Sequence, residues 1–277
     1  MMNIVLFGGS GFIGKRVEQM LSERGHRVKA VQRVDFDYLR PQKDRLMPLL
    51  QGADCVVNAV GVMSYRADVL ETVHHIAPLE IARSACEAGV GRFVQLSALG
   101  AHKDHETAFL GSKGRGDAAL LQSGLDVRIA RPSVVFGRGG ASCELFIKLA
   151  KLPLLPLPEG GAYRLQPVHV DDVAEGLCRL VEEKRVVSDV VDMAGGRECS
   201  LAEYLAVMRR NIHGKDTRKI IPIPAWVADL AAYAAKRFSN GMVSSDSMKL
   251  LRVGSVAEST GFEALLGRKP LSVDCFQ

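Results

Sequence analysis

The stretch that decides the fold is residues 7–14, Phe7-Gly8-Gly9-Ser10-Gly11-Phe12-Ile13-Gly14. An apolar run of strand length, Asn3–Phe7, precedes it, and a helix-like segment, Phe12–Arg24, follows it. Glycine permits a tight turn and a close approach of the backbone to a pyrophosphate, and the next helix offers N–H donors and a partial positive charge. Because the turn opens a βαβ unit, it predicts dinucleotide binding rather than an ordinary glycine-rich connection.

Beyond this turn, strand-like and helix-like segments alternate. We expect strands at Asn3–Phe7, His26–Arg33, Cys55–Val60, Arg92–Leu96 and Asp126–Ala130, and helices at Phe12–Arg24, Arg66–Ala88 and Glu106–Gln122. Strands that alternate with helices form parallel sheets with helices on both faces. The fold class predicted is therefore α/β, a Rossmann-type doubly wound parallel sheet.

The pattern loosens after Gly137, where residues 137–140 and 153–161 are rich in glycine and proline and predict loops. Further on we expect helices at Val170–Glu183, from the capping box Ser200-Leu-Ala-Glu203 to about Arg210, and at Ala225–Phe238, with a strand at Val190–Met193. We predict a dinucleotide-binding domain over residues 1–137, with contributions from 162–195. Residues 138–161 and 196–277 are predicted to form a smaller α/β cap on the substrate side.

Composition is that of a globular protein that binds no nucleic acid. Of the 277 residues, 47% are hydrophobic and 24% are charged, which allows a sizeable core. The net charge of +5 is spread along the chain, whereas nucleic-acid binders cluster basic residues into a patch. A modestly basic surface suits a phosphorylated cofactor.

The cysteines and the N-terminus predict a cytoplasmic protein. The six cysteines are far apart and include no C-x-x-C pair, so we expect reduced thiols and a reducing compartment. The first strand is expected from Asn3, which leaves no room for a signal peptide. No apolar run is long enough to cross a bilayer, so we predict no transmembrane segment.

Cofactor specificity is read at the end of the second strand. NAD sites usually place an acid there to bind the ribose 2′-hydroxyl, but this chain has Gln32 followed by Arg33. Arginine binds a 2′-phosphate in a bidentate manner, so NADP(H) is favoured. In the alternative, Arg33 is solvated, Asp35 serves the ribose and NAD(H) is bound. We include Arg33, Asp35 and Phe36 among the predicted cofactor-binding residues.

Further segments resemble a known superfamily. They are Asn58-Ala59-Val60-Gly61, Ser97-Ala98-Leu99-Gly100, Ser112-Lys113, residues 131–137 (Arg-Pro-Ser-Val-Val-Phe-Gly) and residues 166–173 (Gln-Pro-Val-His-Val-Asp-Asp-Val). With the glycine turn, they resemble the short-chain dehydrogenase/reductase superfamily over about residues 3–200. The chain is most similar to atypical, extended-type members, among them bacterial relatives of the nucleotide-binding accessory subunit of respiratory complex I.

The resemblance implies particular site residues. In that superfamily a Ser, a Tyr and a Lys carry out hydride-transfer chemistry, and they correspond here to Ser97, Phe109 and Lys113. Lys113 also holds the nicotinamide ribose, and Ser97 either holds a substrate oxygen or bonds backbone. The resemblance further assigns to the cofactor Ala59, Val60, Gly61, Pro132, Ser133 and Val134.

Phe109 stands where the family has its proton donor. Phenylalanine has no titratable proton, and its presence would remove a contribution on the order of 10²–10⁴-fold from a reduction step. One hypothesis is therefore an NADP(H)-binding protein without normal catalysis, such as an accessory or assembly factor of a membrane redox complex or a nucleotide sensor. The other is an active NAD(P)-dependent reductase or epimerase-like enzyme that uses Ser97 with a substitute donor and an unknown small-molecule substrate.

Four side chains are candidates for that substitute: Tyr65, His102, His105 and Tyr163. Tyr65 follows the Asn58–Gly61 segment by a few residues, and the two histidines follow Ser97 in a loop expected to border the cleft. A histidine can shuttle protons near neutral pH, but we expect these two to be exposed loop residues.

Other polar and apolar clusters have structural interpretations. We expect Arg131 to be a buried structural arginine and His74-His75 to have a surface or packing role. Asp171-Asp172 is expected to cap a helix rather than to bind a metal, and no metal site is predicted.

In the last expected helix, one face would carry Trp226, Leu230, Tyr233 and Ala234. That face could touch a membrane surface, although such helices more often pack on their own domain.

Overall fold

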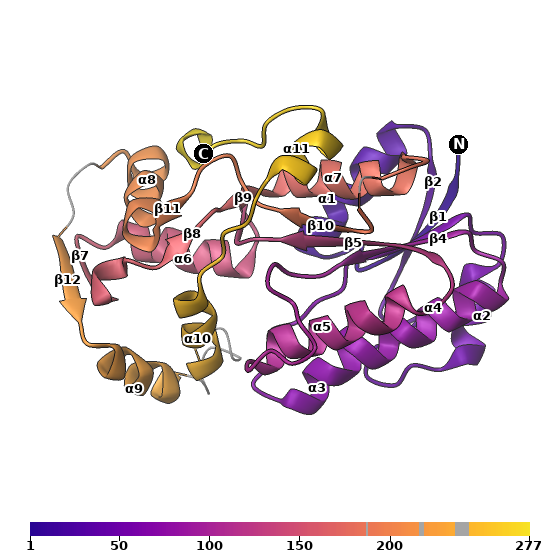
Figure 1. Cartoon of the computed structure of the whole chain (residues 1–277), viewed down its shortest axis with the longest axis horizontal. Coiled ribbons are helices and arrows are strands. Elements are labelled where there is room, and N and C mark those ends of the chain that lie inside the picture. Colours follow the sequence, from indigo (N-terminus) through magenta and orange to yellow (C-terminus); the bar gives the residue numbers. More distant parts are fainter. Residues whose placement is uncertain (187, 216–218, 236–243) are drawn as a thin grey trace.

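The fold is built on one parallel sheet that is covered by helices on both faces (Figure 1). The structure, a computed structural model, describes residues 1–186, 188–215, 219–235 and 244–277. The six strands run in the order β10-β5-β4-β3-β1-β2, and every pair in this sheet is parallel. They are β1 Asn3–Phe7, β2 Arg27–Val31, β3 Cys55–Asn58, β4 Arg92–Leu96, β5 Asp126–Pro132 and β10 Val190–Met193.

The strand order reverses direction at β1, and this places the candidate site. Phe7, at the end of β1, is in register with Val31 of β2 on one side and Asn58 of β3 on the other. In open parallel sheets, ligands bind outside the carboxyl ends of the strands at such a switch point. The glycine turn after β1 and the Asn58–Gly61 segment after β3 are therefore adjacent at the expected place.

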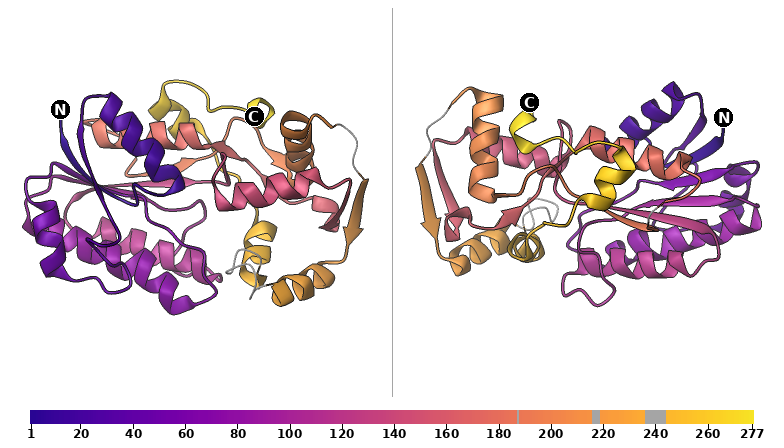
Figure 2. Two further views of the ribbon diagram at one scale, coloured as in Figure 1. Left: turned by 180° about the vertical axis from the view of Figure 1, so that it is seen from behind. Right: turned by 45° about the horizontal axis from the view of Figure 1, so that its top comes forward.

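Two helical layers bury the two faces of the sheet (Figure 2). One layer comprises α1 Phe12–Glu23, α7 Val170–Glu182 and α11 Thr260–Leu266. The other comprises α2 Lys43–Leu50, α3 Ala67–Glu71, α4 Ala77–Glu87 and α5 Ala108–Leu121. Along β1, Ile4 and Leu6 contribute to the first core while Val5 and Phe7 contribute to the second, so the strand is apolar throughout.

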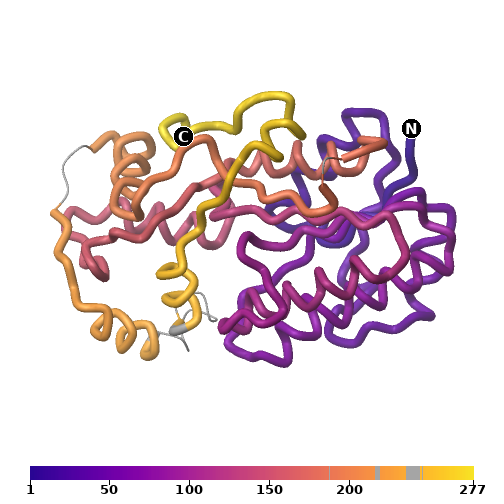
Figure 3. Tube along the Cα trace, viewed as in Figure 1, coloured from indigo at the N-terminus to yellow at the C-terminus, as the bar shows by residue number. Residues whose placement is uncertain are grey.

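A third core lies in the C-terminal part of the chain, around the fully buried Tyr204. Its longer elements are α6 Ala141–Lys151, β7 Leu154–Pro158, α8 Leu201–His213, β12 Lys219–Ile223, α9 Ala225–Ala235 and α10 Ser245–Val253. Four two-residue strands complete it: β6 Val135–Phe136, β8 Arg164–Leu165, β9 Val168–His169 and β11 Cys199–Ser200. After α10 the chain returns to the large sheet, where α11 packs (Figure 3). The domain limits given above stay a prediction.

Several elements differ from the expectations. Helices α2 and α6 were not anticipated, and the loop expected over residues 153–161 is wrong for Leu154–Pro158, which forms β7. The prolines of β7 are tolerated because this strand pairs only with β12 in a two-stranded sheet.

One strand end and the course of one helix also differ from the expectations, and the end of another helix is not described. Strand β2 ends at Val31 rather than Arg33, because the Asp35 carboxylate accepts a hydrogen bond from the backbone N–H of Gln32 and forms a turn. The helix expected over residues 66–88 is interrupted by a π turn at Thr72–Ile76. The last part of the helix expected at Ala225–Phe238, residues 236–238, lies outside the described residues.

Candidate functional site

The glycine turn is shaped for close contact between backbone segments. Gly8 has φ of +83°, and a Cβ built on Gly14 would lie 2.0 Å from the carbonyl oxygen of Gly8. Among the described residues, helix α1 has no side-chain cap at Gly11 and no acid in its first turn. Its N-terminal amides can therefore receive an anion, and the residues present fit the pyrophosphate of a dinucleotide.

The three residues of the loop after β2 that were predicted to bind the cofactor have different environments. Arg33 is exposed, as a ligand for a phosphate must be. The Asp35 carboxylate accepts the hydrogen bond from Gln32 N–H at 3.0 Å, which occupies one of its oxygens. Phe36 is buried against Phe7, with ring centroids 5.7 Å apart, so its observed contacts are those of a core residue.

Asn58 organises the loop after β3 through a buried polar network. Its Oδ1 accepts hydrogen bonds from the Tyr38 hydroxyl at 2.7 Å and from Val60 N–H at 3.2 Å, and its Nδ2 donates to Gln95 Oε1 at 2.9 Å. A Cβ on Gly8 would meet the backbone of Ala59 at 2.9 Å, so the two loops touch. Ala59 and Val60 therefore border the glycine turn, whereas Gly61 faces Lys113 and His74, and the cofactor contact of all three stays a prediction.

Lys113 and Phe109 lie together on helix α5. Lys113 is 5% exposed, and its Nζ donates a hydrogen bond to Leu96 O at 3.2 Å. The same Nζ is 3.5 Å from where a Cβ on Gly61 would stand, so Lys113 reaches the loop after β3. Burial lowers the pKa of Lys113 to about 8, against an opposing effect of the Asp117 charge.

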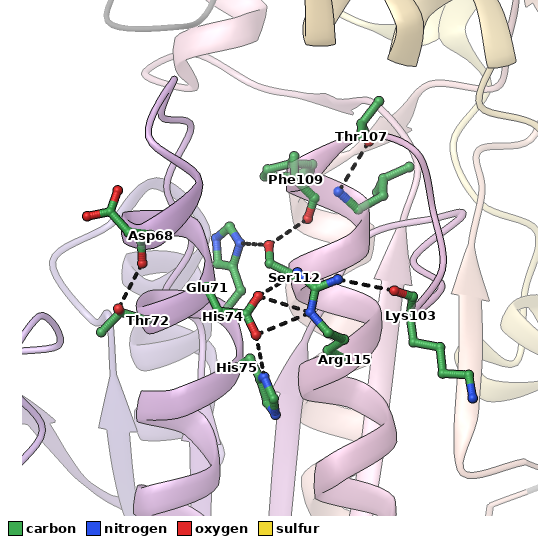
Figure 4. Close-up of polar contacts among 11 residues, drawn as sticks. Asp68, Glu71, Thr72, His74, His75, Lys103, Thr107, Phe109, Ser112 and Arg115 are labelled. Carbon is green, nitrogen blue, oxygen red and sulfur yellow. Dashed lines mark hydrogen bonds and ion pairs between the residues drawn. The ribbon is translucent and has the colours of Figure 1, made fainter.

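His74 belongs to the π turn and is buried against α5 (Figure 4). Its Nε2 lies 3.2 Å from Val62 N–H, from which it accepts, and its Nδ1 lies 3.0 Å from Ser112 Oγ, which donates on to Phe109 O. These bonds assign the neutral tautomer with the proton on Nδ1. Burial, aided by the charge of Lys113, lowers the pKa of His74 to about 2. The packing role predicted for His74 is confirmed, and both of its nitrogens have protein partners.

The π turn and α5 approach each other very closely. A Cβ on Gly116 would stand 2.0 Å from the carbonyl oxygen of His74, so only glycine fits there. Beside this contact, Arg115 donates to the Glu71 carboxylate from Nε at 3.0 Å, and His75 Nδ1 lies 2.6 Å from the same group (Figure 4). The segment after the third strand and the helix that carries Lys113 are thus held as one unit.

Ser97 is engaged by a buried ion pair. Its hydroxyl donates a 2.8 Å hydrogen bond to Asp117 Oδ2, which also accepts from Arg131 Nε at 2.9 Å. Asp117 is 1% exposed, and burial raises its pKa, whereas Arg131, Ser97 and Lys113 oppose that rise. Arg131 pairs with Asp117 as a structural arginine would, but it is half-buried rather than buried as expected. Sequence reasoning missed Asp117, although its position four residues after Lys113 on one helix was a signal.

The three residues after Arg131 that were assigned to the cofactor are tied into the fold, Val134 through its carbonyl oxygen, which accepts from Val168 N–H at 3.0 Å. Ser133 N–H donates to Met193 O at 3.0 Å, and its hydroxyl donates to Gln166 O. The carbonyl oxygen of Pro132 accepts from Leu99 N–H at 2.9 Å. These bonds join the loop after β4, the end of β5 and β10, so Pro132 and Ser133 belong to the same strand ends as Ser97.

The substitute proton donors are dispersed. Tyr65 is 57% exposed, and His102 is an exposed loop residue as predicted. His105 Nδ1 accepts hydrogen bonds from the backbone and side chain of Thr107, at 3.1 and 3.0 Å. Tyr163 is 8% exposed and belongs to the C-terminal core. Ser97 and Lys113 are instead hydrogen-bonded to Asp117 and to Leu96 O.

The remaining predicted clusters have structural partners. Asp172 is buried, accepts from Leu271 N–H at 2.7 Å and pairs with Arg268, while Asp171 pairs with Arg16 at 3.3 Å. Where residues are described, no group of three or more His, Cys, Asp or Glu side chains is arranged to hold a metal. All six cysteines are free thiols.

Helix α9 does not bury the face that was expected to pack. Trp226, Leu230 and Tyr233 are 68%, 64% and 70% exposed, and Ala234 is exposed as well. Packing on the domain was therefore the wrong expectation for this face; Ala228 and Ala232 are the buried positions instead. Over the described ranges, no helix combines the length and the apolar character needed to cross a bilayer.

The fold and site define a protein with a Rossmann-type dinucleotide-binding fold. Residues 4–111 match the model of the NAD dependent epimerase/dehydratase family. This part of the chain is therefore similar to that family, in agreement with the resemblance noted in the sequence.

The chain is similar to curated proteins with different names. The chain is 26% identical, over 81% of its length, to NADH dehydrogenase (ubiquinone) 1 alpha subcomplex subunit 9, mitochondrial, from Mus musculus. It is 25% identical, over 64% of its length, to a ceramide reductase from Caulobacter vibrioides. It spans 66% and 61% of these two relatives, just under two thirds of their lengths.

A solved structure has the same fold. Human epimerase family protein SDR39U1, whose crystal structure contains NADPH, superposes with a TM-score of 0.71 at 21% identity. The match covers 99% of this chain and 97% of that one. At this level of identity the match confirms the fold.

Proposed function

We propose that the protein binds NADP(H) and does not carry out tyrosine-dependent hydride transfer. Its role would be that of an accessory or assembly factor of a membrane redox complex, or of a nucleotide sensor. The observation that carries the proposal is Phe109, which lies in the family's tyrosine position with its ring 5.4 Å from the His74 ring and 5.7 Å from Lys113 Nζ. The residues that would surround a proton donor are present, but the side chain at the donor position is a hydrocarbon ring without a titratable proton.

Two polar neighbours, His74 and Ser97, do not replace the missing hydroxyl. His74 has both nitrogens bonded within the protein and a pKa of about 2, so it does not shuttle protons near neutral pH. The hydroxyl proton of Ser97 is directed at Asp117. Neither His74 nor Ser97 therefore supplies a proton at the position of Phe109.

The preference for NADP(H) rests on charge at the end of β2. Arg33 is exposed there, and the neighbouring Asp35 is engaged by Gln32 N–H. A 2′-phosphate at this place would bind the guanidinium group of Arg33. One oxygen of the nearby Asp35 carboxylate is already hydrogen-bonded. The NADPH in the human structure of the same fold is compatible with this preference.

The proposed partner is a protein of a membrane redox complex, because the mouse relative is named as a subunit of NADH dehydrogenase. We retain the predicted cytoplasmic location as part of the proposal, although that relative is named as mitochondrial. Cell fractionation, followed by gel electrophoresis of solubilised membranes, tests the location and the partner together.

The central experiment separates binding from turnover. Calorimetry with NADPH and NADH should show NADPH binding more tightly, while NADPH absorbance at 340 nm should not fall across a broad panel of aldehydes and ketones. A Gly14→Ala variant is the control that should lose the binding. Absence of heat with both coenzymes would contradict the binding proposal, and substrate-dependent NADPH oxidation would contradict the lack of catalysis.

A second candidate is an active reductase, favoured by one observation. Lys113 is buried with a pKa of about 8, so its ammonium group can release a proton near neutral pH. The Caulobacter relative is named a reductase. In this case the carbonyl panel would first detect NADPH oxidation by the wild type, and Lys113→Met would abolish that activity.

A further inference from the structure

Asp117 is a buried carboxylate at the centre of the strand ends where the second half of a dinucleotide would lie. Ser97 follows β4, Arg131 is in β5, and both reach Asp117 Oδ2, with Arg131 Nη2 at 2.8 Å. The other oxygen, Oδ1, is buried without a protein partner among the described residues. Buried polar atoms are nearly always hydrogen-bonded, so this oxygen marks a position for water or a ligand group.

The contact with Asp117 fixes what Ser97 can offer. A serine hydroxyl has one hydrogen to donate and two lone pairs that accept. Because the hydrogen is directed at the carboxylate, only lone pairs remain, and Ser97 can accept a hydrogen bond but cannot donate one to a carbonyl oxygen. A group that Ser97 recognises in this arrangement must itself be a donor, such as a hydroxyl or an amide N–H.

Asp117 also lies four residues after Lys113, on the same face of α5. The Lys113 ammonium contacts Leu96 O and the Phe109 ring, neither of which carries a formal charge. The charge of Asp117 opposes the burial that lowers the Lys113 pKa.

We propose that Asp117 is a positioning residue of the cofactor site: it fixes Ser97 as a hydrogen-bond acceptor and keeps the buried Lys113 charged. The ligand group expected next to Ser97 is therefore a hydrogen-bond donor. The inference rests on the proposed function for its ligand, but the roles of Asp117 can be measured without any cofactor.

The ionisable groups around Lys113 define the controls. His74 faces it from the π turn and remains neutral, and Asp117 faces it from its own helix. Arg131 of β5 pairs with Asp117 of α5. Burial raises the pKa of the half-buried Asp192 in β10, and the charge of Arg131 opposes that rise. The carboxylate that acts on the Lys113 pKa is that of Asp117, whereas Asp192 is influenced by Arg131, so Asp192→Asn is the matched control for Asp117→Asn.

The test follows Lys113 by NMR in the full chain without cofactor, using the ¹³Cε shift in protein labelled at lysine and assigned with Lys113→Met. Asp117→Asn should lower the midpoint of titration by about one pH unit or more, because an opposite charge is removed and Arg131 is left unpaired. Asp192→Asn and Ser97→Ala, which retain the charge of Asp117, should leave the midpoint close to that of the wild type. An unchanged midpoint in Asp117→Asn would overturn the role proposed for its charge.

The second arm measures NADPH affinity against pH. In Asp117→Asn, affinity should fall at a lower pH than in the wild type, by the same shift that NMR gives. A uniform loss at every pH, together with an unshifted NMR midpoint, would mean that Asp117 is only structural. If the wild type does not bind NADPH, the proposed function fails, whereas the NMR arm still decides the effect on Lys113. Should Asp117→Asn not fold, Asp117→Glu keeps the charge and Ser97→Ala isolates the hydrogen bond.

The hydrogen bond has its own readout. With Ser97→Ala, Asp117 loses a donor that lowers its pKa, so the carboxyl ¹³C titration of Asp117 should move upward. If the Asp117 titration is the same in the wild type and in Ser97→Ala, the hydroxyl is not committed to Asp117 and Ser97 remains free to donate.

Discussion

The Nζ atom of Lys113 lies 5.7 Å from the centroid of the Phe109 ring, within the range of a cation–π contact. In the superfamily that this site resembles, the same lysine would lower the pKa of a tyrosine hydroxyl. Here the ammonium meets the face of a hydrocarbon ring and donates its hydrogen bond to Leu96 O. The Lys113 charge therefore lies beside the proposed cofactor position, but the tyrosine hydroxyl on which that charge would act is missing.

The first prediction is that Phe109→Tyr creates turnover. The added hydroxyl would lie near Lys113, which favours the tyrosinate and so lowers the tyrosine pKa toward neutral pH. Relative to the wild type, NADPH oxidation with responsive carbonyl compounds should rise by about 10²-fold or more, the usual contribution of a positioned acid.

The control is Phe109→Tyr combined with Lys113→Met, in which the hydroxyl is present without the charge. This double variant should return to the background rate. If Phe109→Tyr stays at background while it still binds NADPH, the missing hydroxyl is not what limits the site.

A second prediction concerns the glycine turn. In Gly14→Ala, the new Cβ would lie 2.0 Å from Gly8 O, so the turn must move and the amides that face the pyrophosphate move with it. NADPH affinity should fall by about 100-fold or more, which corresponds to roughly 2.7 kcal/mol. Calorimetry measures this, and thermal unfolding reports any loss of stability.

Gly261 supplies the matched substitution for that experiment. It begins α11 with no heavy atom within 4 Å of a built Cβ, so Gly261→Ala should bind NADPH like the wild type. Equal affinity of Gly14→Ala and Gly261→Ala would contradict the assignment of the turn to the pyrophosphate.

The sequence predicted the large sheet because each of its strands carries a local signal. Asn3–Phe7 and Arg92–Leu96 are observed with the predicted bounds, since strands buried on both faces are continuous apolar runs. The strand Leu154–Pro158 was missed because its prolines indicate a loop, and its pairing with β12 depends on residues more than sixty positions away.

The candidate site was predictable where a motif fixes the residue and less so where packing does. Gly8 and Gly14 were located from spacing, and Ser97 and Lys113 from the resemblance to a known superfamily. The partner of Ser97 was not, because Asp117 is one carboxylate among many in the sequence and acquires its role only when α5 packs against the ends of β4 and β5. Likewise, nothing local distinguished buried His74 from its neighbour His75.

The third prediction addresses cofactor choice. Replacing Arg33 with Ser removes the exposed guanidinium at the end of β2, while the Asp35 turn does not depend on it. The affinity for NADPH should fall by about tenfold or more, the size of one charge-assisted hydrogen bond, and the affinity for NADH should be unchanged. NADH serves as the internal control in the same titration. A parallel loss for both coenzymes would place Arg33 away from the 2′-phosphate.

The fourth prediction follows from the buried, neutral His74. Its pKa is about 2 in the folded protein and 6.5 as an unperturbed group, so between these values the unfolded chain binds one proton more. The stability that this residue contributes is complete above pH 6.5 and is lost as the pH falls below that value. The slope is about 1.4 kcal/mol per pH unit for one proton. Urea unfolding at pH 7.0, 6.0 and 5.0 should show this decline.

In His74→Gln, whose side chain cannot titrate, the decline should be shallower by up to one proton, whatever the variant's stability at pH 7.0. The exposed His102 gives the control, because His102→Gln removes a histidine at the surface and should keep the slope of the wild type. If His74→Gln and the wild type lose stability in parallel, the imidazole accepts protons in the folded state and the neutral tautomer assigned to it is wrong.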